Sequence, residues 1–175
     1  ERKSKTYVGA KAGKLYLRHN SLAEDIPLVV AMKALGVGSD QAVMQMVGIE
    51  KEYMQAFAPS MEEAAQLGVF TTTQALDFIG PRVRLPRKPG PPTPLTARKT
   101  PIEESRELLT DIVLAHVPVH ALDLSAKAIY LGVMARRVLQ AMQSIVPIDD
   151  RDYVGNKRLE LAGQLLALLF EDLFK

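Results

Sequence analysis

The pattern of hydrophobic and polar positions changes after the first twenty residues. Two short runs rich in β-forming side chains, residues 5–11 and 14–19, are separated by Ala12 and Gly13. Two such runs around a two-residue turn are typical of a β-hairpin. After the second run the pattern becomes helical and remains so, apart from residues 81–100. The pattern therefore predicts a mainly α fold: a multi-helix domain with a short N-terminal β-hairpin.

Four short helices in the first half are predicted from start and stop signals. A proline at the first position or a Ser or Thr cap marks each start, and a glycine marks each stop. The predicted pairs are Pro27 and Gly36, Ser39 and Gly48, Ser60 and Gly68, and Thr71 and Gly80. Two of the caps have a Glu or Gln three residues later, which is the capping-box spacing. They are Ser60 with Glu63 and Thr71 with Gln74.

Residues 81–100 differ in composition from the rest of the chain. Prolines alternate there with basic residues, and no acid occurs: Pro81, Pro86, Pro89, Pro91, Pro92 and Pro94 with Arg82, Arg84, Arg87, Lys88, Arg98 and Lys99. Proline at this density excludes a helix or a central strand, so we expect an exposed, partly polyproline loop. Three roles stay open: a solvated connection, phosphate contacts, or a PxxP segment bound by an aromatic-lined groove.

Two further helices are predicted before the C-terminal segment. The first begins at Thr100, where a capping threonine, a following proline and a Glu three residues later coincide, and we expect it to continue to Pro118. The second is capped by Asp123 or Ser125 and should be central to the core. Its apolar stripe comprises Leu124, Ala128, Leu131, Ala135, Val138 and Met142, widened by Ile129, Val133 and Leu139.

The last predicted helix, from about Lys157, is apolar around most of its circumference. Such a helix needs neighbours on several sides. The chain also begins without Met and stops inside a helical pattern, so we interpret it as part of a longer protein. Charged and amide side chains interrupt the apolar run, which is shorter than the roughly 20 residues of a membrane span. We expect a soluble segment.

Composition narrows the functional classes. At 175 residues the chain has the size of one domain with a sizeable core. The absence of cysteine excludes disulfides, thiolate zinc sites and cysteine nucleophiles, and it favours an intracellular origin. The formal net charge is only +2, so any contact with nucleic acid would need a local basic patch.

Two groups of side chains resemble metal sites at first. The carboxylates of Asp149, Asp150 and Asp152 are close in sequence, but acids that precede a helix are the more common interpretation. His116 and His120 have the spacing of two zinc ligands on one helical face, yet Pro118 between them interrupts a helix. No phosphate-binding loop or nucleophile motif is present. We therefore predict no catalytic, cofactor-binding or metal-binding residues.

Five phrases carry a resemblance: IPLVVAMKALGVGSDQAVMQMVG, FAPSMEEAAQLGVFTTTQALDFIG, KTPIEESRELLTDIVLAHVPV, AKAIYLGVMARRVLQAM and DDRDYVGNKRLELAGQLLALLFEDLFK. In this order they resemble the second-largest subunit of eukaryotic DNA-directed RNA polymerases. The last phrase is most similar to the RNA polymerase III version, since Gln164 replaces the proline typical of polymerase II. The departures are Val154, where an aromatic residue is usual, and the proline-rich loop.

The resemblance implies a domain organisation and a role. Residues 1–148 would form the lobe, with residues 81–100 as an exposed loop, and residues 149–175 a joint and the start of the helix that returns to the protrusion. The fragment would form a wall of the DNA cleft during DNA-templated RNA synthesis in the nucleus. The family's catalytic magnesium and its zinc are expected elsewhere in the complex, so no cofactor is expected here.

The expected partners are other polymerase subunits, including a TFIIF-like heterodimer, with weak or indirect DNA contact and no membrane. The candidate DNA or phosphate contacts are Arg82, Arg84, Arg87, Lys88, Arg151, Lys157 and Arg158. Two alternatives remain open: a free-standing basic nucleic-acid-binding module, and a proline-motif interaction module.

Overall fold

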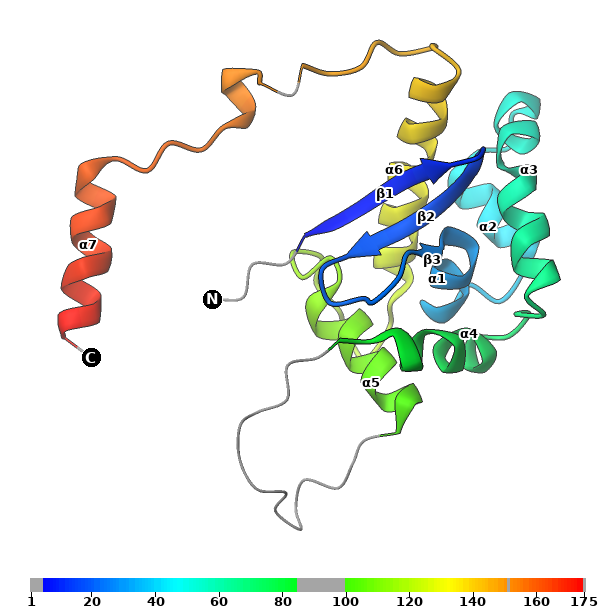
Figure 1. The fold of residues 1–175 in the computed structure, drawn as a ribbon, viewed down its shortest axis with the longest axis horizontal. Coiled ribbons are helices and arrows are strands. Elements are labelled where there is room, and N and C mark those ends of the chain that lie inside the picture. The colour runs from blue at the N-terminus through cyan, green and yellow to red at the C-terminus, as the bar shows by residue number, and fades with distance from the viewer. Residues whose placement is uncertain (1–4, 85–99, 151, 175) are drawn as a thin grey trace. The chain divides into compact units, whose positions relative to one another are not determined.

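The computed structural model of the chain describes residues 5–84, 100–150 and 152–174. It divides into two compact units, Glu1–Ile145 and Val146–Lys175. The described residues form seven α-helices and one small sheet (Figure 1), which confirms the predicted mainly α fold with an N-terminal hairpin. The lobe boundary at residue 148 stays a prediction.

The hairpin consists of β1 (Thr6–Lys11) and β2 (Lys14–His19), paired antiparallel. Ala12 and Gly13 both have left-handed backbone, with φ of 49° and 76°. Two consecutive left-handed residues make the type of turn whose twist matches that of the strands. A third strand, β3 (Ile26–Pro27), pairs with β2 and was not predicted. The sheet order is β1-β2-β3, so β1 is an edge strand.

Four helices follow the sheet: α1 (Leu28–Ala34), α2 (Asp40–Val47), α3 (Lys51–Gln66) and α4 (Thr72–Ile79). Every residue of α1 is buried. The predicted cap of α2 is confirmed, because Ser39 Oγ accepts the Ala42 N–H at 3.1 Å. The capping box of Thr71 and Gln74 on α4 is confirmed in both directions.

Helix α3 contradicts the predicted start at Ser60, because it begins nine residues earlier, at Lys51, and contains Pro59 in its interior. Ser60 is 1% exposed, and its hydroxyl accepts the Leu15 N–H of β2 at 2.9 Å. The Leu15 amide points away from β1, so it needs a partner outside the hairpin. Ser60 thus connects α3 to the sheet, and the capping-box spacing was coincidental.

Replacing Ser60 by alanine is expected to lower the free energy of unfolding by about 1–2 kcal/mol, since the buried Leu15 N–H would lose its acceptor. Urea denaturation measures the loss, and amide exchange at Leu15 should accelerate. Thr73, whose side chain is exposed on α4, offers a control, because Thr73→Ala should change stability by less than about 0.5 kcal/mol. Equal stabilities of the two variants would contradict this role of Ser60.

Residues 80–84, which follow α4, contact other parts of the first unit. Gly80 has right-handed backbone (φ −48°) and opens a short 3₁₀ turn, η1 (Gly80–Arg82). Val83 then forms a bridge with Leu22. Backbone contacts therefore hold the first residues of the predicted loop, of which Pro81 and Arg84 are exposed and Arg82 and Val83 are half-buried. The remainder of that loop, residues 85–99, lies outside the described residues.

Helix α5 (Pro101–Glu107) begins with the predicted capping box of Thr100 and Glu103. It does not continue to Pro118, because the chain passes through a π-helical turn, η2 (Leu108–Ile112), and leaves the helix at Val113. The physical reason is the buried Lys127 side chain, whose ammonium group donates hydrogen bonds to the carbonyl oxygens at the end of this turn. Nothing in the local sequence indicated that interaction.

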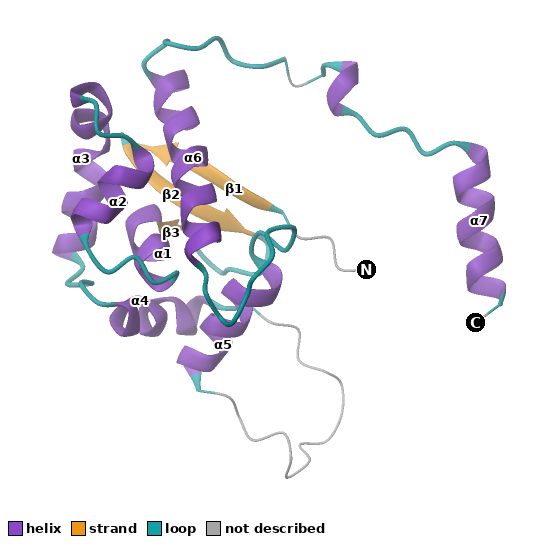
Figure 2. Cartoon of the chain, turned by 180° about the vertical axis from the view of Figure 1, so that it is seen from behind, coloured by secondary structure: helices purple, strands orange, loops and turns teal. Residues whose placement is uncertain are grey.

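Helix α6 (Ser125–Met142) packs against β1, α2 and α3, as expected for the central helix (Figure 2). The N-cap position is Leu124, which has no side-chain cap, so the predicted cap at Asp123 or Ser125 was wrong. The Asp123 carboxylate instead accepts hydrogen bonds from the N–H and the hydroxyl of Ser125, both at 2.9 Å, just before the helix. The predicted stripe was too wide. Ile129 and Val133 are 52% and 47% exposed, since the packing partners cover only one side of the helix.

The second unit contains a 3₁₀ turn, η3 (Val154–Asn156), and α7 (Ala162–Leu173). Helix α7 starts five residues later than predicted, because residues 157–161 are extended or irregular. The described residues include no helix with the length and hydrophobicity needed to cross a membrane.

Candidate functional site

Asp149, Asp150 and Asp152 lie in or next to a turn of the second unit. Asp150 Oδ1 accepts the Asp152 N–H at 2.9 Å, and both side chains are exposed, as is that of Asp149. Because α7 begins only at Ala162, these acids do not complement its N-terminal end, and that part of the interpretation was wrong. Within the described residues no group of three or more His, Asp or Glu side chains is arranged to hold a metal ion.

The two histidines do not share a helical face. His120 forms a bridge with Asp123 across the turn that precedes α6. His116 lies with its ring edge-on to Tyr130 of α6, at 5.0 Å between centroids and an interplanar angle of 75°. The turn after Val113, where Leu114 has a left-handed φ of 50°, brings His116 to this position.

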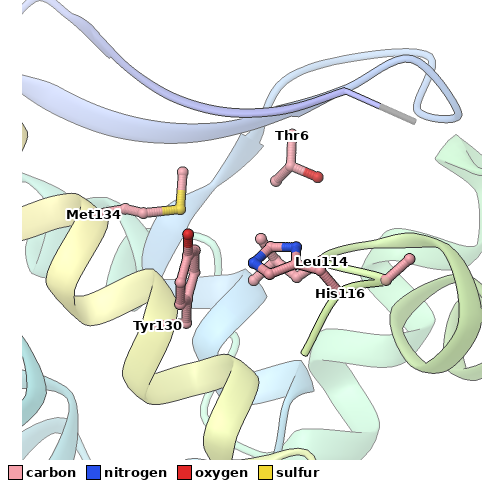
Figure 3. Close-up of a pocket in the computed structure, with 6 residues that line it drawn as sticks. Thr6, Leu114, His116, Tyr130 and Met134 are labelled. Carbon is pink, nitrogen blue, oxygen red and sulfur yellow. The ribbon is translucent and has the colours of Figure 1, made fainter. Parts of the chain in front are cut away.

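A hollow of about 410 Å³ lies between β1 and α6. Thr6 borders it from the strand, Tyr130 and Met134 from α6, and Leu114 and His116 from the loop after the π-helical turn (Figure 3). Its walls combine polar and apolar surface in similar proportion. No sequence motif indicated this hollow, because its lining comes from three segments that are far apart in the chain.

Arg82 is used inside the first unit. Its Nη1 donates to the Phe78 carbonyl at 2.6 Å, and its Nε donates to Glu24 at 3.2 Å. The guanidinium also stacks on the Phe78 ring, 3.9 Å from the ring centroid. These contacts hold η1 against α4, so the structure favours a structural role for Arg82 over a phosphate contact.

The other candidate phosphate contacts have different surroundings. Arg84 has an exposed side chain, while its N–H donates to the Ser21 carbonyl at 2.7 Å. The Lys157 Nζ lies 3.6 Å from Asp152 Oδ1, and the Arg158 side chain is exposed. The remaining candidates, Arg87, Lys88 and Arg151, lie outside the described residues, as do Arg98 and Lys99. Arg84 belongs to the first unit, and Lys157 and Arg158 belong to the second.

The cations of the hairpin are paired within the first unit. The Asp25 carboxylate accepts Lys11 Nζ at 2.6 Å and Arg18 Nε at 2.9 Å. The hydrogen bond from Lys11 lowers the pKa of Asp25 most, although partial burial opposes it.

On the same sheet face, Tyr16 donates its hydroxyl to Glu63 at 2.8 Å. Burial, followed by the hydrogen bond to Glu63, raises the pKa of Tyr16 to about 12. The phenol and carboxylate tie the hairpin to α3. Together with the ion pairs of Asp25, they make this surface a poor phosphate site.

Apolar side chains dominate the surface of the second unit. Large hydrophobic residues from 159 onward are at least half exposed: Leu159, Leu161, Leu165, Leu166, Leu168, Leu169, Phe170, Leu173 and Phe174. An exposed apolar surface of this extent is typical of an interaction surface.

Comparison with known proteins gives a consistent result. The sequence model of the family described as "RNA polymerase Rpb2, domain 2" matches residues 1–160. The chain is similar over its whole length to "DNA-directed RNA polymerase III subunit RPC2" of Schizosaccharomyces pombe (58% identical) and of Saccharomyces cerevisiae (50%). It is 32% identical, over 94% of its length, to "DNA-directed RNA polymerase subunit Rpo2" of Saccharolobus solfataricus. The chain spans 15%, 15% and 14% of these relatives' lengths, respectively.

Proposed function

The chain belongs to the family of RNA polymerase Rpb2, domain 2, and from this membership we propose that it is a domain of the second-largest subunit of a DNA-directed RNA polymerase of the polymerase III type. The observation that carries the proposal is the 58% identity to the Schizosaccharomyces pombe subunit over the whole chain. The domain acts within the nuclear enzyme that joins ribonucleotides on a DNA template. Residues 1–148 form the lobe, and residues 149–175 lead back into the protrusion.

The domain's own contribution is architectural. It forms one wall of the DNA cleft and docks a TFIIF-like pair of subunits, while the catalytic magnesium and the zinc of the enzyme are held elsewhere. The exposed apolar side chains of α7 support a role in contacts with protein.

A segment exchange tests whether the chain is such a domain. The corresponding segment of RPC2 in Schizosaccharomyces pombe is replaced by this chain, and growth and assembly of polymerase III are measured. We expect growth, because 58% identity preserves most contact residues. The same exchange with the Saccharolobus solfataricus segment, which is 32% identical to this chain, should fail and serves as the control. A chimeric subunit that accumulates but never assembles would contradict the proposal.

Docking of the TFIIF-like pair needs its own experiment. The tagged chain is used as bait in nuclear extract treated with nuclease at moderate salt, and retained proteins are identified by mass spectrometry. We expect recovery of the TFIIF-like polymerase III subunits. Recovery of only the other large subunit, with a bait that is folded by circular dichroism, would assign the domain an internal structural role and refute docking.

If the chain contacts DNA, replacing exposed basic side chains should change DNA binding slightly, and replacing Arg82 should not. We expect replacement of Arg84, Lys157 and Arg158 by alanine to reduce the salt dependence of DNA binding by about one unit per lost phosphate contact. Arg82→Ala should instead reduce stability, because its guanidinium contacts Phe78 and Glu24. Fluorescence anisotropy over a range of salt concentrations measures the first effect and urea denaturation the second. Unchanged DNA binding in the triple variant would exclude these residues as phosphate contacts.

A further inference from the structure

We infer that the outer edge of β1 is a binding site for an extended segment of a partner polypeptide, which adds a fourth strand to the sheet and places one apolar side chain in the hollow beside α6. The inference joins two independent observations, an open row of backbone hydrogen-bonding groups and a side-chain pocket directly next to it. Strand addition uses this combination: the backbone gives affinity, and pockets for alternate side chains give specificity.

The open backbone groups follow from the hairpin register. In a hairpin with a two-residue turn, the pair next to the turn is hydrogen-bonded, and bonded and non-bonded pairs then alternate. Lys11 pairs with Lys14, so Thr6, Val8 and Ala10 belong to non-bonded pairs and direct their N–H and C=O groups away from β2. The opposite strand confirms this alternation, because the Leu15 N–H points away from β1 and reaches Ser60.

These groups have no partner in the described part of the chain. The sheet order leaves β1 without a neighbour on its outer side, and no described hydrogen bond involves the outward groups of Thr6, Val8 or Ala10. Ala10 is exposed, and Thr6 and Val8 are half-buried because their side chains face α6. An uncovered edge of this kind is a template for strand pairing unless a native partner occupies it.

The hollow supplies a pocket at the right place. Thr6 and Val8 project from the face of the sheet that α6 covers, since they pair with the buried His19 and Leu17. An added strand beside β1 would direct alternate side chains toward the same side. One of them would meet Tyr130 and Met134 of α6 and the His116 ring, within a volume of about 410 Å³ (Figure 3). This space suits a Leu- or Phe-sized side chain.

Charge distinguishes a different polypeptide from a second copy of this chain. Antiparallel self-pairing centred on Val8 would place Lys5 opposite Lys11 of the copy, which is a like-charge pair. Lysine on an edge strand is a common means of preventing such self-association. A partner segment with an acidic residue opposite Lys5 would meet that ammonium group favourably, whereas Lys11 is already paired with Asp25 at 2.6 Å. The occupant we propose is therefore an extended acidic segment with an apolar centre.

The test uses four synthetic seven-residue peptides with blocked ends. Each has Glu at both ends and alternating Thr and Val between them, and one central inward position is Ala, Leu, Phe or Lys. We expect the Leu or Phe peptide to bind most tightly by fluorescence anisotropy. In the complex, hydrogen exchange should slow at the amides of Thr6, Val8 and Ala10 but remain unchanged at Tyr7 and Gly9, which already pair with β2.

Matched variants separate the two parts of the site. Ala10→Pro removes one outward N–H from an edge position that tolerates proline, and should weaken binding about five- to ten-fold, whereas Ala10→Thr keeps the N–H and should bind normally. Tyr130→Ala should abolish the preference for Leu or Phe. Ile129→Ala, a neighbouring exposed position on α6 that does not line the hollow, should preserve it.

Three outcomes would overturn the inference. Failure of all four peptides to bind at millimolar concentration would exclude strand addition at this edge. Binding without protection of the Thr6, Val8 and Ala10 amides would place the peptide elsewhere. Dimers of the chain by sedimentation velocity, with these amides protected in the absence of peptide, would identify a second copy as the occupant. None of these outcomes bears on whether the chain is a polymerase domain.

Discussion

Replacement of Lys127 by methionine is expected to lower the free energy of unfolding by about 3 kcal/mol. Lys127 is 1% exposed, and its ammonium group donates to the carbonyls of Leu109, Thr110 and Val113 at 2.9, 2.7 and 2.6 Å. Methionine has a similar length but no donor, so three carbonyl oxygens would lose their partner at the end of the π-helical turn. Urea denaturation measures the change.

The sign of this effect depends on which cost is larger. Burial lowers the pKa of Lys127, and the charge of Asp111 opposes this only in part, so the buried ammonium group itself carries a desolvation cost. Methionine removes that cost, which in other proteins makes apolar replacement of buried charges neutral. Here the acceptors remain behind, and each unsatisfied carbonyl costs about 1–3 kcal/mol. The loss of three hydrogen bonds should therefore dominate.

A lysine on the surface provides the control. Lys51 begins α3 with an exposed side chain, and Lys51→Met should change stability by less than about 0.5 kcal/mol. The Lys127 variant should also lose the defined conformation of the loop after Val113, which hydrogen exchange in residues 113–119 would detect. A stability within about 0.5 kcal/mol of the parent would mean that water or a rearranged turn satisfies the three carbonyls.

Replacement of Gly132 by alanine is expected to cost about 2–3 kcal/mol, because the new methyl group has no space. A Cβ at this position would lie 2.7 Å from the Met46 carbonyl oxygen and 2.9 Å from Met46 Cβ. Two of the three nearest atoms belong to the backbone of α2, so the clash is relieved only if α2 and α6 separate. The normal gain of about 1 kcal/mol for alanine over glycine in a helix would not offset this.

Gly163 is the matched control for Gly132. It also lies in a helix, α7, but a Cβ there would have no atom within 4 Å. Gly163→Ala should leave the free energy of unfolding unchanged or raise it by about 1 kcal/mol at most, through a higher helix content of α7. Thermal and urea denaturation of both variants gives the comparison. A Gly132 variant as stable as the parent would mean that the contact between α2 and α6 is looser than the structure indicates.

The polymerase assignment was accessible from the sequence, whereas most of the interaction geometry was not. The five phrases span nearly the whole chain, and the relatives confirm the family that they indicated. The proposed phosphate contacts came from composition alone. Composition cannot show that Arg82 is bound to Phe78 and Glu24 while Arg84 is exposed, because Glu24 lies 58 residues away in the chain.

The sequence predicted correctly those turns and helix starts whose hydrogen bonds join residues close together in the chain. The hairpin turn at Ala12 and Gly13, and the caps at Ser39, Thr71 and Thr100, satisfy backbone groups within a few residues, so the sequence by itself was sufficient to place them. Only the tertiary structure decided the features that depend on distant partners. Ser60 was taken for a cap because its true partner, the Leu15 amide, is 45 residues away. Lys127 of α6 binds the carbonyl of Val113, where the helical segment that starts at Pro101 ends. The hollow beside β1 exists only because the loop after Val113, the strand and α6 meet there.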